Sequence, residues 1–434
     1  MAVLLKRHMA IIAAFVSVTV VLSVYSHIYA SAGRATVYIE DIYGDQAELN
    51  GITVNGVLQD RYHRLIFDVK DGETKTRTEY NQHYKDIIPP YYNVNYNAKM
   101  FDGIQYTYEL EPGWKMKVMI SYFDLRSMDQ ENWMNYSLDF TTDVIGPGGN
   151  QYSLTNDTGY AMASTGGKIY FTVPTTREYT GTNGIYEIVK FYSMSDRLLM
   201  EANNLTSPKD AVRTVTTFSL DGNKDGGPTI EVLGLEAAGD KLALILAIDG
   251  MLVVRTYDPK SGAMLGEVAL DDFRLVEYRE GSEDRAKAYY PPYHAFSDNR
   301  SLNLCFRSSA STQDADVFAI LSFDVSEGIT LESNIEERYT EGEPERFWDI
   351  TAKNGKLYVV VLLRERRGQS FVTYDVLFPK RLLLYAYKAG TLVYKGELVT
   401  DMDDDVALER QRNISGDFIY DVPRYRHFAD VELR

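Results

Sequence analysis

The residues best suited to chemistry form a short polar stretch with the spacing of a calcium-binding loop. Asp221, Asn223 and Asp225 occupy its first, third and fifth positions, and Gly226 follows at the sixth. Calcium loops of this kind use oxygen ligands at these positions and a glycine at the sharp turn. The twelfth position is Val232, where a bidentate glutamate would be needed. The stretch predicts either a calcium site or a plain glycine-rich hairpin turn, and we expect no other cofactor.

Tyrosine is abundant, with 33 copies in the 434 residues. Two stretches, 88–93 and 289–294, combine a rigid Pro-Pro backbone with several rings. Such rings are apolar with a polar tip, so exposed loops of this type suit stacking on sugars or peptides. The alternative is that these rings only pack against neighbouring strands. The predicted ligand-binding residues are Tyr91, Tyr92, Tyr290 and Tyr293.

No sequence motif indicates a catalytic centre. Beyond the N-terminal segment the histidines are far apart, at positions 63, 83, 294 and 427. No zinc-protease, nucleophile-elbow or P-loop motif occurs. The single cysteine, Cys305, excludes an internal disulfide and thiolate-based metal clusters, and its apolar neighbours predict a place in the core. The sequence therefore favours a protein without catalytic activity.

The N-terminal segment, residues 1–33, has the pattern of a membrane anchor. Lys6 and Arg7 precede an uncharged stretch, in which residues 9–30 would span about 33 Å as a helix. That length crosses a hydrocarbon core, and the positive-inside rule places the N-terminus in the cytoplasm. The alternative is a signal peptide cleaved near Ala32, which would release a secreted protein. We expect residues 34–434 to lie outside the cytoplasm, single-pass tethered or secreted.

The body of the chain is strongly strand-like. Short runs of β-branched and aromatic residues alternate with turn residues, and nine Asn-Gly or Asp-Gly pairs punctuate them. This pattern predicts an all-β fold of antiparallel hairpins. Helical windows are few and short, such as 208–217 and 407–412. The formal charge of −17 repels phosphate backbones, so we expect no nucleic-acid partner.

A loose repeat indicates how these strands are organised. Segments 239–265 and 355–394 both combine a Lys-hydrophobic strand, a strand ending in Tyr-Asp or Tyr, and a glycine-containing hairpin. The chain here resembles membrane-tethered, extracytoplasmic β-propeller-like proteins of Gram-positive bacteria. The resemblance implies a propeller, which we expect over 34–434. About 400 residues at roughly 55–65 per unit give six to eight blades, with seven favoured. The last strand, 428–433, would close the ring on a strand near 35–40. The alternative is two β-sandwich domains divided near 146–150.

These observations predict a non-catalytic binding or scaffold protein, attached to the cell membrane by its N-terminal segment. Its expected partner is a cell-wall polymer or an envelope protein. An enzyme is the alternative, namely a cell-envelope glycan hydrolase or lyase on a propeller scaffold. A purely structural envelope protein is a third reading.

Overall fold

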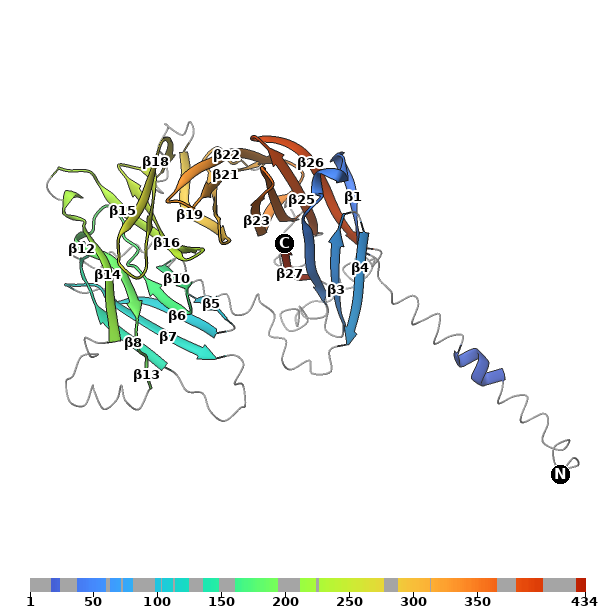
Figure 1. Cartoon of the computed structure of the whole chain (residues 1–434), viewed down its shortest axis with the longest axis horizontal. Helices are drawn as coiled ribbons and strands as arrows, with labels where there is room; N and C mark the ends of the chain where they lie inside the picture. The colour runs from blue at the N-terminus through green and yellow to red at the C-terminus, as the bar shows by residue number, and fades with distance from the viewer. Residues whose placement is uncertain are drawn as a thin grey trace, which may run out of the picture. The chain divides into compact units, whose positions relative to one another are not determined.

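The computed structural model of the chain describes residues 17–23, 37–59, 63–71, 73–80, 98–102, 104–111, 114–124, 136–147, 161–193, 211–223, 226–276, 288–312, 314–364, 380–400 and 427–434. This part of the chain is all-β, as the sequence predicts (Figure 1). Residues 17–23 of the N-terminal segment are helical. Within the described ranges, no helix combines the length and the apolar character that a membrane crossing requires.

The chain divides into two compact units. The first contains Met1–Ile87, Val372–Leu384 and Tyr394–Arg434, and the second contains Ile88–Phe371 and Tyr385–Val393. The segment 146–150, where the alternative of two β-sandwich domains places its boundary, lies inside the second unit. Strands on the two sides of this segment also exchange partners: β9 (Asp143–Ile145) pairs with β12 (Thr180–Ile188), and β13 (Tyr192–Ser193) pairs with β8 (Tyr136–Thr141).

In the first unit, one sheet has the order β27-β2-β3-β4. Its strands are β27 (His427–Leu433), β2 (Thr53–Gln59), β3 (His63–Lys70) and β4 (Glu73–Tyr80). A strand therefore exists at the predicted position 428–433, but its partner is β2 and not a strand at 35–40. The strand at that earlier position, β1 (Val37–Gly44), pairs instead with β26 (Thr391–Thr400). A short 3₁₀ helix, η1 (Gln46–Leu49), joins β1 to β2.

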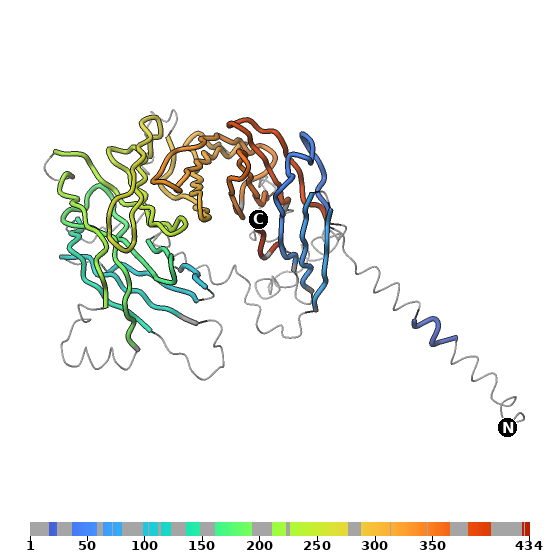
Figure 2. The backbone as a smooth tube through the Cα atoms, viewed as in Figure 1, coloured from blue at the N-terminus to red at the C-terminus, as the bar shows by residue number. Residues whose placement is uncertain are grey.

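The second unit contains three sheets, which follow one another along the chain. Figure 2 shows this succession as a colour change from cyan through green and yellow to orange. The first has the order β13-β8-β7-β6-β5, with β5 (Ala98–Phe101), β6 (Ile104–Glu111) and β7 (Lys117–Asp124). The next has the order β10-β11-β12-β14, with β10 (Met162–Thr165), β11 (Lys168–Phe171) and β14 (Val212–Ser219). Strand β14 occupies the described part of the helical window predicted at 208–217, because Val212, Val215 and the threonines of this run favour a pleated strand. The other predicted window, 407–412, lies outside the described residues.

The third sheet is eight-stranded and consists of two antiparallel halves. The first half is β15 (Ile230–Ala238), β16 (Lys241–Ile248), β17 (Met251–Tyr257) and β18 (Met264–Leu275). The second half is β19 (Ala288–Ser297), β20 (Ser301–Ser308), β21 (Asp316–Asp324) and β22 (Thr330–Tyr339). Strands β18 and β19 are joined by a short parallel contact, in which Arg274 pairs with Ala288 and Leu275 pairs with Tyr289. A fifth sheet has the order β1-β26-β25-β24-β23, with β23 (Glu343–Lys353), β24 (Lys356–Arg364) and β25 (Lys380–Lys388).

Several Asp-Gly and Asn-Gly pairs form the tight hairpins that the sequence predicts. Asp249-Gly250 joins β16 to β17, and Asn354-Gly355 joins β23 to β24. All four residues have positive φ, which a two-residue hairpin of the primed type requires. Asn183-Gly184, by contrast, lies in the middle of β12, where a Cβ on Gly184 would come within 2.5 Å of the Thr216 carbonyl oxygen. There the glycine permits close packing of strands.

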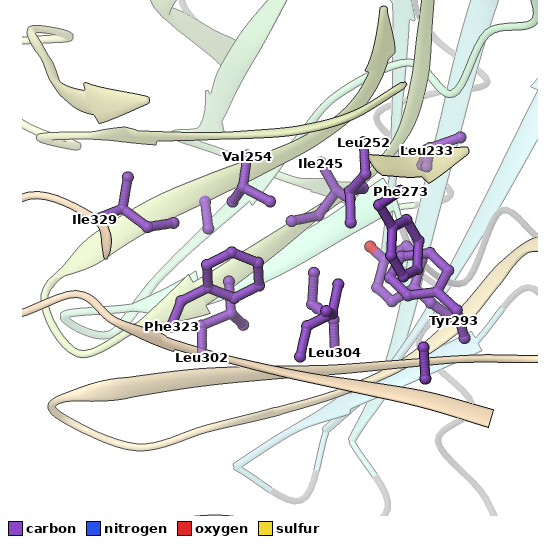
Figure 3. Packing of buried hydrophobic residues seen from close by; sticks show 14 of the residues in the cluster. Leu233, Ile245, Leu252, Val254, Phe273, Tyr293, Leu302, Leu304, Phe323 and Ile329 are labelled. Carbon is purple, nitrogen blue, oxygen red and sulfur yellow. The ribbon is translucent and has the colours of Figure 1, made fainter. Parts of the chain in front are cut away.

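The main core of the eight-stranded sheet lies between its two halves. Figure 3 shows Ile245, Leu252 and Val254 facing Leu302, Leu304 and Phe323. Tyr293 and Phe273 lie at one end of this core (Figure 3). Cys305, on the opposite face of β20 from Leu304, is fully buried, and burial raises the pKa of its thiol well above the usual value. Its predicted place in the core is confirmed.

Candidate functional site

A buried carboxylate on β15 is the centre of the candidate site. Glu236 is only 8% exposed, although it lies on a strand whose neighbours are almost all apolar. An ionised group in such a place is costly unless charged or hydrogen-bonding partners compensate it. Two side chains from other sheets or sheet halves supply that compensation.

Lys99 and Tyr293 both donate hydrogen bonds to this carboxylate. The Lys99 ammonium, on β5, is 3.0 Å from Glu236 Oε2, and it also donates to the carbonyl oxygen of Met162 at 2.8 Å. The Tyr293 hydroxyl, on β19, donates to Glu236 Oε1 at 3.1 Å. The four residues that meet here, Lys99, Met162, Glu236 and Tyr293, thus come from four successive strand groups of the second unit.

An irregularity in β19 positions Tyr293. Between Tyr289, opposite Ser308, and Tyr293, opposite Phe306, β19 advances four residues while β20 advances two. The extra residues include Pro291 and Pro292, which lack the N–H that a regular ladder needs. The strand therefore bulges here, and Tyr293 enters the core, where its ring lies 5.5 Å from the ring of Phe306.

The arrangement is chemically suited to proton transfer. A carboxylate such as that of Glu236 can accept a proton and a hydroxyl such as that of Tyr293 can donate one, while the Lys99 ammonium hydrogen-bonds the carboxylate between them. Exposure is graded across the cluster: Tyr293 is 1% exposed, whereas the Lys99 side chain is 26% exposed. A small molecule arriving from solvent would therefore meet Lys99 first.

The structure places the predicted tyrosines differently from one another. Tyr290 and Tyr293 lie on strand β19 rather than on a loop, with Tyr290 partly buried and Tyr293 inside the core. Tyr91 and Tyr92 lie outside the described residues. Ligand binding by these four residues stays a prediction, and Tyr293 is buried rather than an exposed stacking ring.

The predicted calcium ligands are only partly described. Asp221 begins a short 3₁₀ helix, η6 (Asp221–Asn223), and its carboxylate accepts hydrogen bonds from the Gly181 N–H at 2.9 Å and the Ser219 hydroxyl at 3.2 Å. Asp225 lies outside the described residues. Across the ranges that the structure describes, no three His, Cys, Asp or Glu side chains gather as metal ligands. Calcium binding at Asp221, Asn223 and Asp225 stays a prediction.

Sequence reasoning missed Lys99 and Glu236. They are 137 residues apart, and neither belongs to a motif. One signal could have found Glu236: it is a charged residue in the otherwise apolar end of a strand, Leu-Gly-Leu-Glu-Ala-Ala. Such a residue needs a partner when the strand is buried on both faces.

Comparisons with known proteins give remote structural likeness alone. No family model matches the chain, and no curated protein matches it. A lignostilbene dioxygenase from Pseudomonas brassicacearum has 9% identity and a TM-score of 0.28, over 83% of this chain and 66% of the dioxygenase. Cobalt-substituted Synechocystis apocarotenoid oxygenase has 10% identity and a TM-score of 0.31, over 84% of this chain and 94% of the oxygenase. Prolyl oligopeptidase B from Galerina marginata has 10% identity and a TM-score of 0.32, over 81% of this chain and 44% of the oligopeptidase.

This comparison corrects one prediction from the sequence. The structures that the chain resembles over more than four fifths of its length are named as enzymes, so the prediction of a non-catalytic binding or scaffold protein is withdrawn. The activities of those enzymes do not transfer to this chain, because the identities and TM-scores are too low.

Proposed function

We propose that this chain is an enzyme of the general acid–base class, with Glu236, Tyr293 and Lys99 as its reactive centre. The observation that carries the proposal is the convergence of three proton-bearing side chains on one buried point, from strands 57 to 137 residues apart. A buried ion pair is weak evidence for stability, because apolar residues of similar volume stabilise a core equally well. What supports a chemical role here is that this ion pair also meets a buried tyrosine hydroxyl on the second carboxylate oxygen.

In this proposal each residue has a distinct role. Glu236 removes a proton from the substrate, and Tyr293 returns one to the oxygen or carbon that becomes basic. Lys99 orients the Glu236 carboxylate through its hydrogen bond to Oε2. The Met162 carbonyl oxygen fixes the direction of the Lys99 ammonium, so the centre is organised before substrate arrives.

We also propose that the strand groups are the blades of a six-bladed β-propeller. The support is topological: the two halves of the eight-stranded sheet and the other four sheets make six groups of four or five strands. Strand β1 completes the last group, and β27 completes the first, as in rings closed by both chain ends. Six lies within the expected range of six to eight blades, below the favoured seven.

The location follows from the N-terminal segment. We propose that residues 9–30 anchor the chain and that the β-rich part lies outside the cytoplasm. Protease added to intact cells should then degrade the β-rich part and spare the N-terminus. Degradation only after lysis, or a mature N-terminus near Ala32 in the medium, would overturn the anchor.

The acid–base proposal can be tested with a substrate that needs only a base. Ring opening of 5-nitrobenzisoxazole requires removal of one C–H proton and releases a coloured phenolate. We expect the purified chain to accelerate it, and Glu236→Gln to lower the rate about 10²- to 10⁴-fold. Glu336→Gln is the matched control, because Glu336 also accepts a tyrosine hydrogen bond, from Tyr289 at 3.2 Å.

The controls separate chemistry from folding. Each variant should unfold within a few degrees of the wild-type midpoint by circular dichroism. If folded Glu236→Gln retains the full rate, or if Glu336→Gln loses as much, Glu236 is not the base and the proposal fails.

A further inference from the structure

The ammonium group of Lys99 has one hydrogen-bond donor more than its two partners use. A lysine ammonium carries three N–H donors. One points to the Met162 carbonyl oxygen at 2.8 Å and one to Glu236 Oε2 at 3.0 Å. Within the described part of the chain, the third N–H has no acceptor. The side chain is 26% exposed, so this donor can be reached from solvent.

An apolar ring lies on the same face of the strand. Lys99 and Phe101 are two residues apart on β5, which places both side chains on one face. The Lys99 ammonium is 6.0 Å from the centre of the Phe101 ring. The accessible side of the cluster therefore combines a positively charged donor with an apolar surface.

We propose that the substrate of this centre is a small carboxylic acid with an apolar body, whose carboxylate accepts the third N–H of Lys99 while its apolar part packs against Phe101. This inference rests on the proposed function, because it uses the same centre. Charge-assisted hydrogen bonds of this kind are stronger than neutral ones. A carboxylate held at Lys99 also lies next to Glu236, where its neighbouring C–H can meet the base.

The negative charge of Glu236 should affect how strongly Lys99 binds an anion. Glu236 neutralises part of the attraction that Lys99 exerts on an incoming anion, because both carboxylates lie within a few ångströms of the same ammonium. Removing that charge should strengthen the binding of anions while it abolishes base catalysis. The same substitution therefore moves binding and activity in opposite directions, which a structural role of the cluster does not predict.

The test uses 4-fluorobenzoate, observed by fluorine NMR in titrations of the full chain. The wild-type chain should bind it, and 4-fluorobenzamide, which has the same shape without the charge, should bind at least tenfold more weakly. Lys99→Met should lose at least tenfold in affinity, and Lys99→Arg, which keeps a charged donor, should retain most of it. Glu236→Gln should bind on the order of tenfold more tightly.

Lys117→Met is the matched control. Lys117 is 35% exposed and also pairs with carboxylates, those of Glu111 and Asp139, but it lies outside the cluster. Phe101→Leu should lower the affinity for 4-fluorobenzoate and leave the affinity for acetate unchanged. Equal binding of the benzamide, equal loss in Lys117→Met, or displacement by inorganic phosphate as efficient as by acetate would overturn the carboxylate assignment.

The outcomes separate this inference from the proposed function. Tighter binding by Glu236→Gln without any base-catalysed ring opening in the wild-type chain would retain the carboxylate site and remove the acid–base role. Ring opening that depends on Glu236, with no carboxylate bound by any variant, would retain the acid–base role and remove the carboxylate site.

Discussion

At the scale of single residues, tyrosine hydroxyls bound to carboxylates recur through the protein. Besides Tyr293 with Glu236, Tyr289 donates to Glu336, Tyr387 to Glu337 at 2.7 Å and Tyr394 to Asp41 at 2.6 Å. Burial and the nearby Glu336 raise the pKa of Tyr289 to about 12. Outside the candidate site, these three tyrosines thus have a structural use, in which the ring packs between strands and the hydroxyl satisfies an acidic side chain.

A second buried carboxylate, Glu187 on β12, is held differently. Burial alone would raise its pKa, but hydrogen bonds from Lys168 and Arg213 more than compensate, and the pKa is lowered overall. Lys168 approaches at 2.6 Å, and Arg213 also donates to the Pro259 carbonyl oxygen at 2.7 Å. Glu187 therefore ties β11 and β14 together and, through Arg213, to the turn after β17.

This ion cluster predicts a pH dependence. Because the folded pKa of Glu187 is lowered, its contribution is present above the unfolded value of about 4.3 and is lost as the pH falls through the folded value. Glu187→Gln should reduce the free energy of unfolding by about 1–3 kcal/mol at pH 7 and by less at pH 3. Urea unfolding at both pH values measures this, and an equal loss at both would contradict it.

At the scale of elements, Asn-Gly pairs serve two purposes that composition does not distinguish. Asn354-Gly355 turns the chain, whereas Asn183-Gly184 continues a strand. Within β12, the Asn183 amide donates to the Val173 carbonyl oxygen at 2.7 Å and is fully buried. The sequence predicts the antiparallel hairpins correctly, but it wrongly predicts a turn at Asn183-Gly184. The feature that requires Gly184, the nearby carbonyl oxygen of Thr216, belongs to another strand and is not visible in the local sequence.

Glycines within a strand and glycines at a hairpin turn should lose different amounts of stability when a methyl group is added. Gly184→Ala should destabilise the protein by about 2–3 kcal/mol, because its Cβ would overlap the Thr216 carbonyl oxygen. Gly390→Ala, at a hairpin with φ of 76° and open space, should cost about 1 kcal/mol from backbone strain alone. Chemical denaturation of both variants compares them. Similar costs would show that backbone conformation and not the close approach limits Gly184.

At the scale of the molecule, both ends of the described chain complete sheets begun elsewhere in the sequence. Strand β27 pairs with β2, where Val431 faces Gly56 and Leu433 faces Val54, and β1 pairs with β26. Val431 and Leu433 are 2% and 8% exposed. The sequence predicts a closing strand at 428–433, but its partner depends on register and strand order, which a single strand does not encode.

A chain that ends at Arg426 tests the importance of this closure. Removing β27 should cost about 3–6 kcal/mol from Val431 and Leu433 alone and should leave β2 without a partner on one edge. Hydrogen exchange should then show lost protection over 53–59 and retained protection over 241–248. Glu432→Gln, an exposed position on the same strand, should change neither region. Unchanged protection of β2 in the shortened chain would refute the role of β27.

The sequence by itself determined the fold class, the hairpin turns at Asp249 and Asn354, the burial of Cys305 and the presence of a strand at 428–433. These depend on local alternation, turn chemistry and apolar context, which act over a few residues. The tertiary structure alone decided the strand partners, the strand in the described part of the helical window predicted at 208–217, and the meeting of Lys99, Glu236 and Tyr293. Those depend on register and on bulges such as that at Pro291 and Pro292, which bring together side chains more than 50 residues apart.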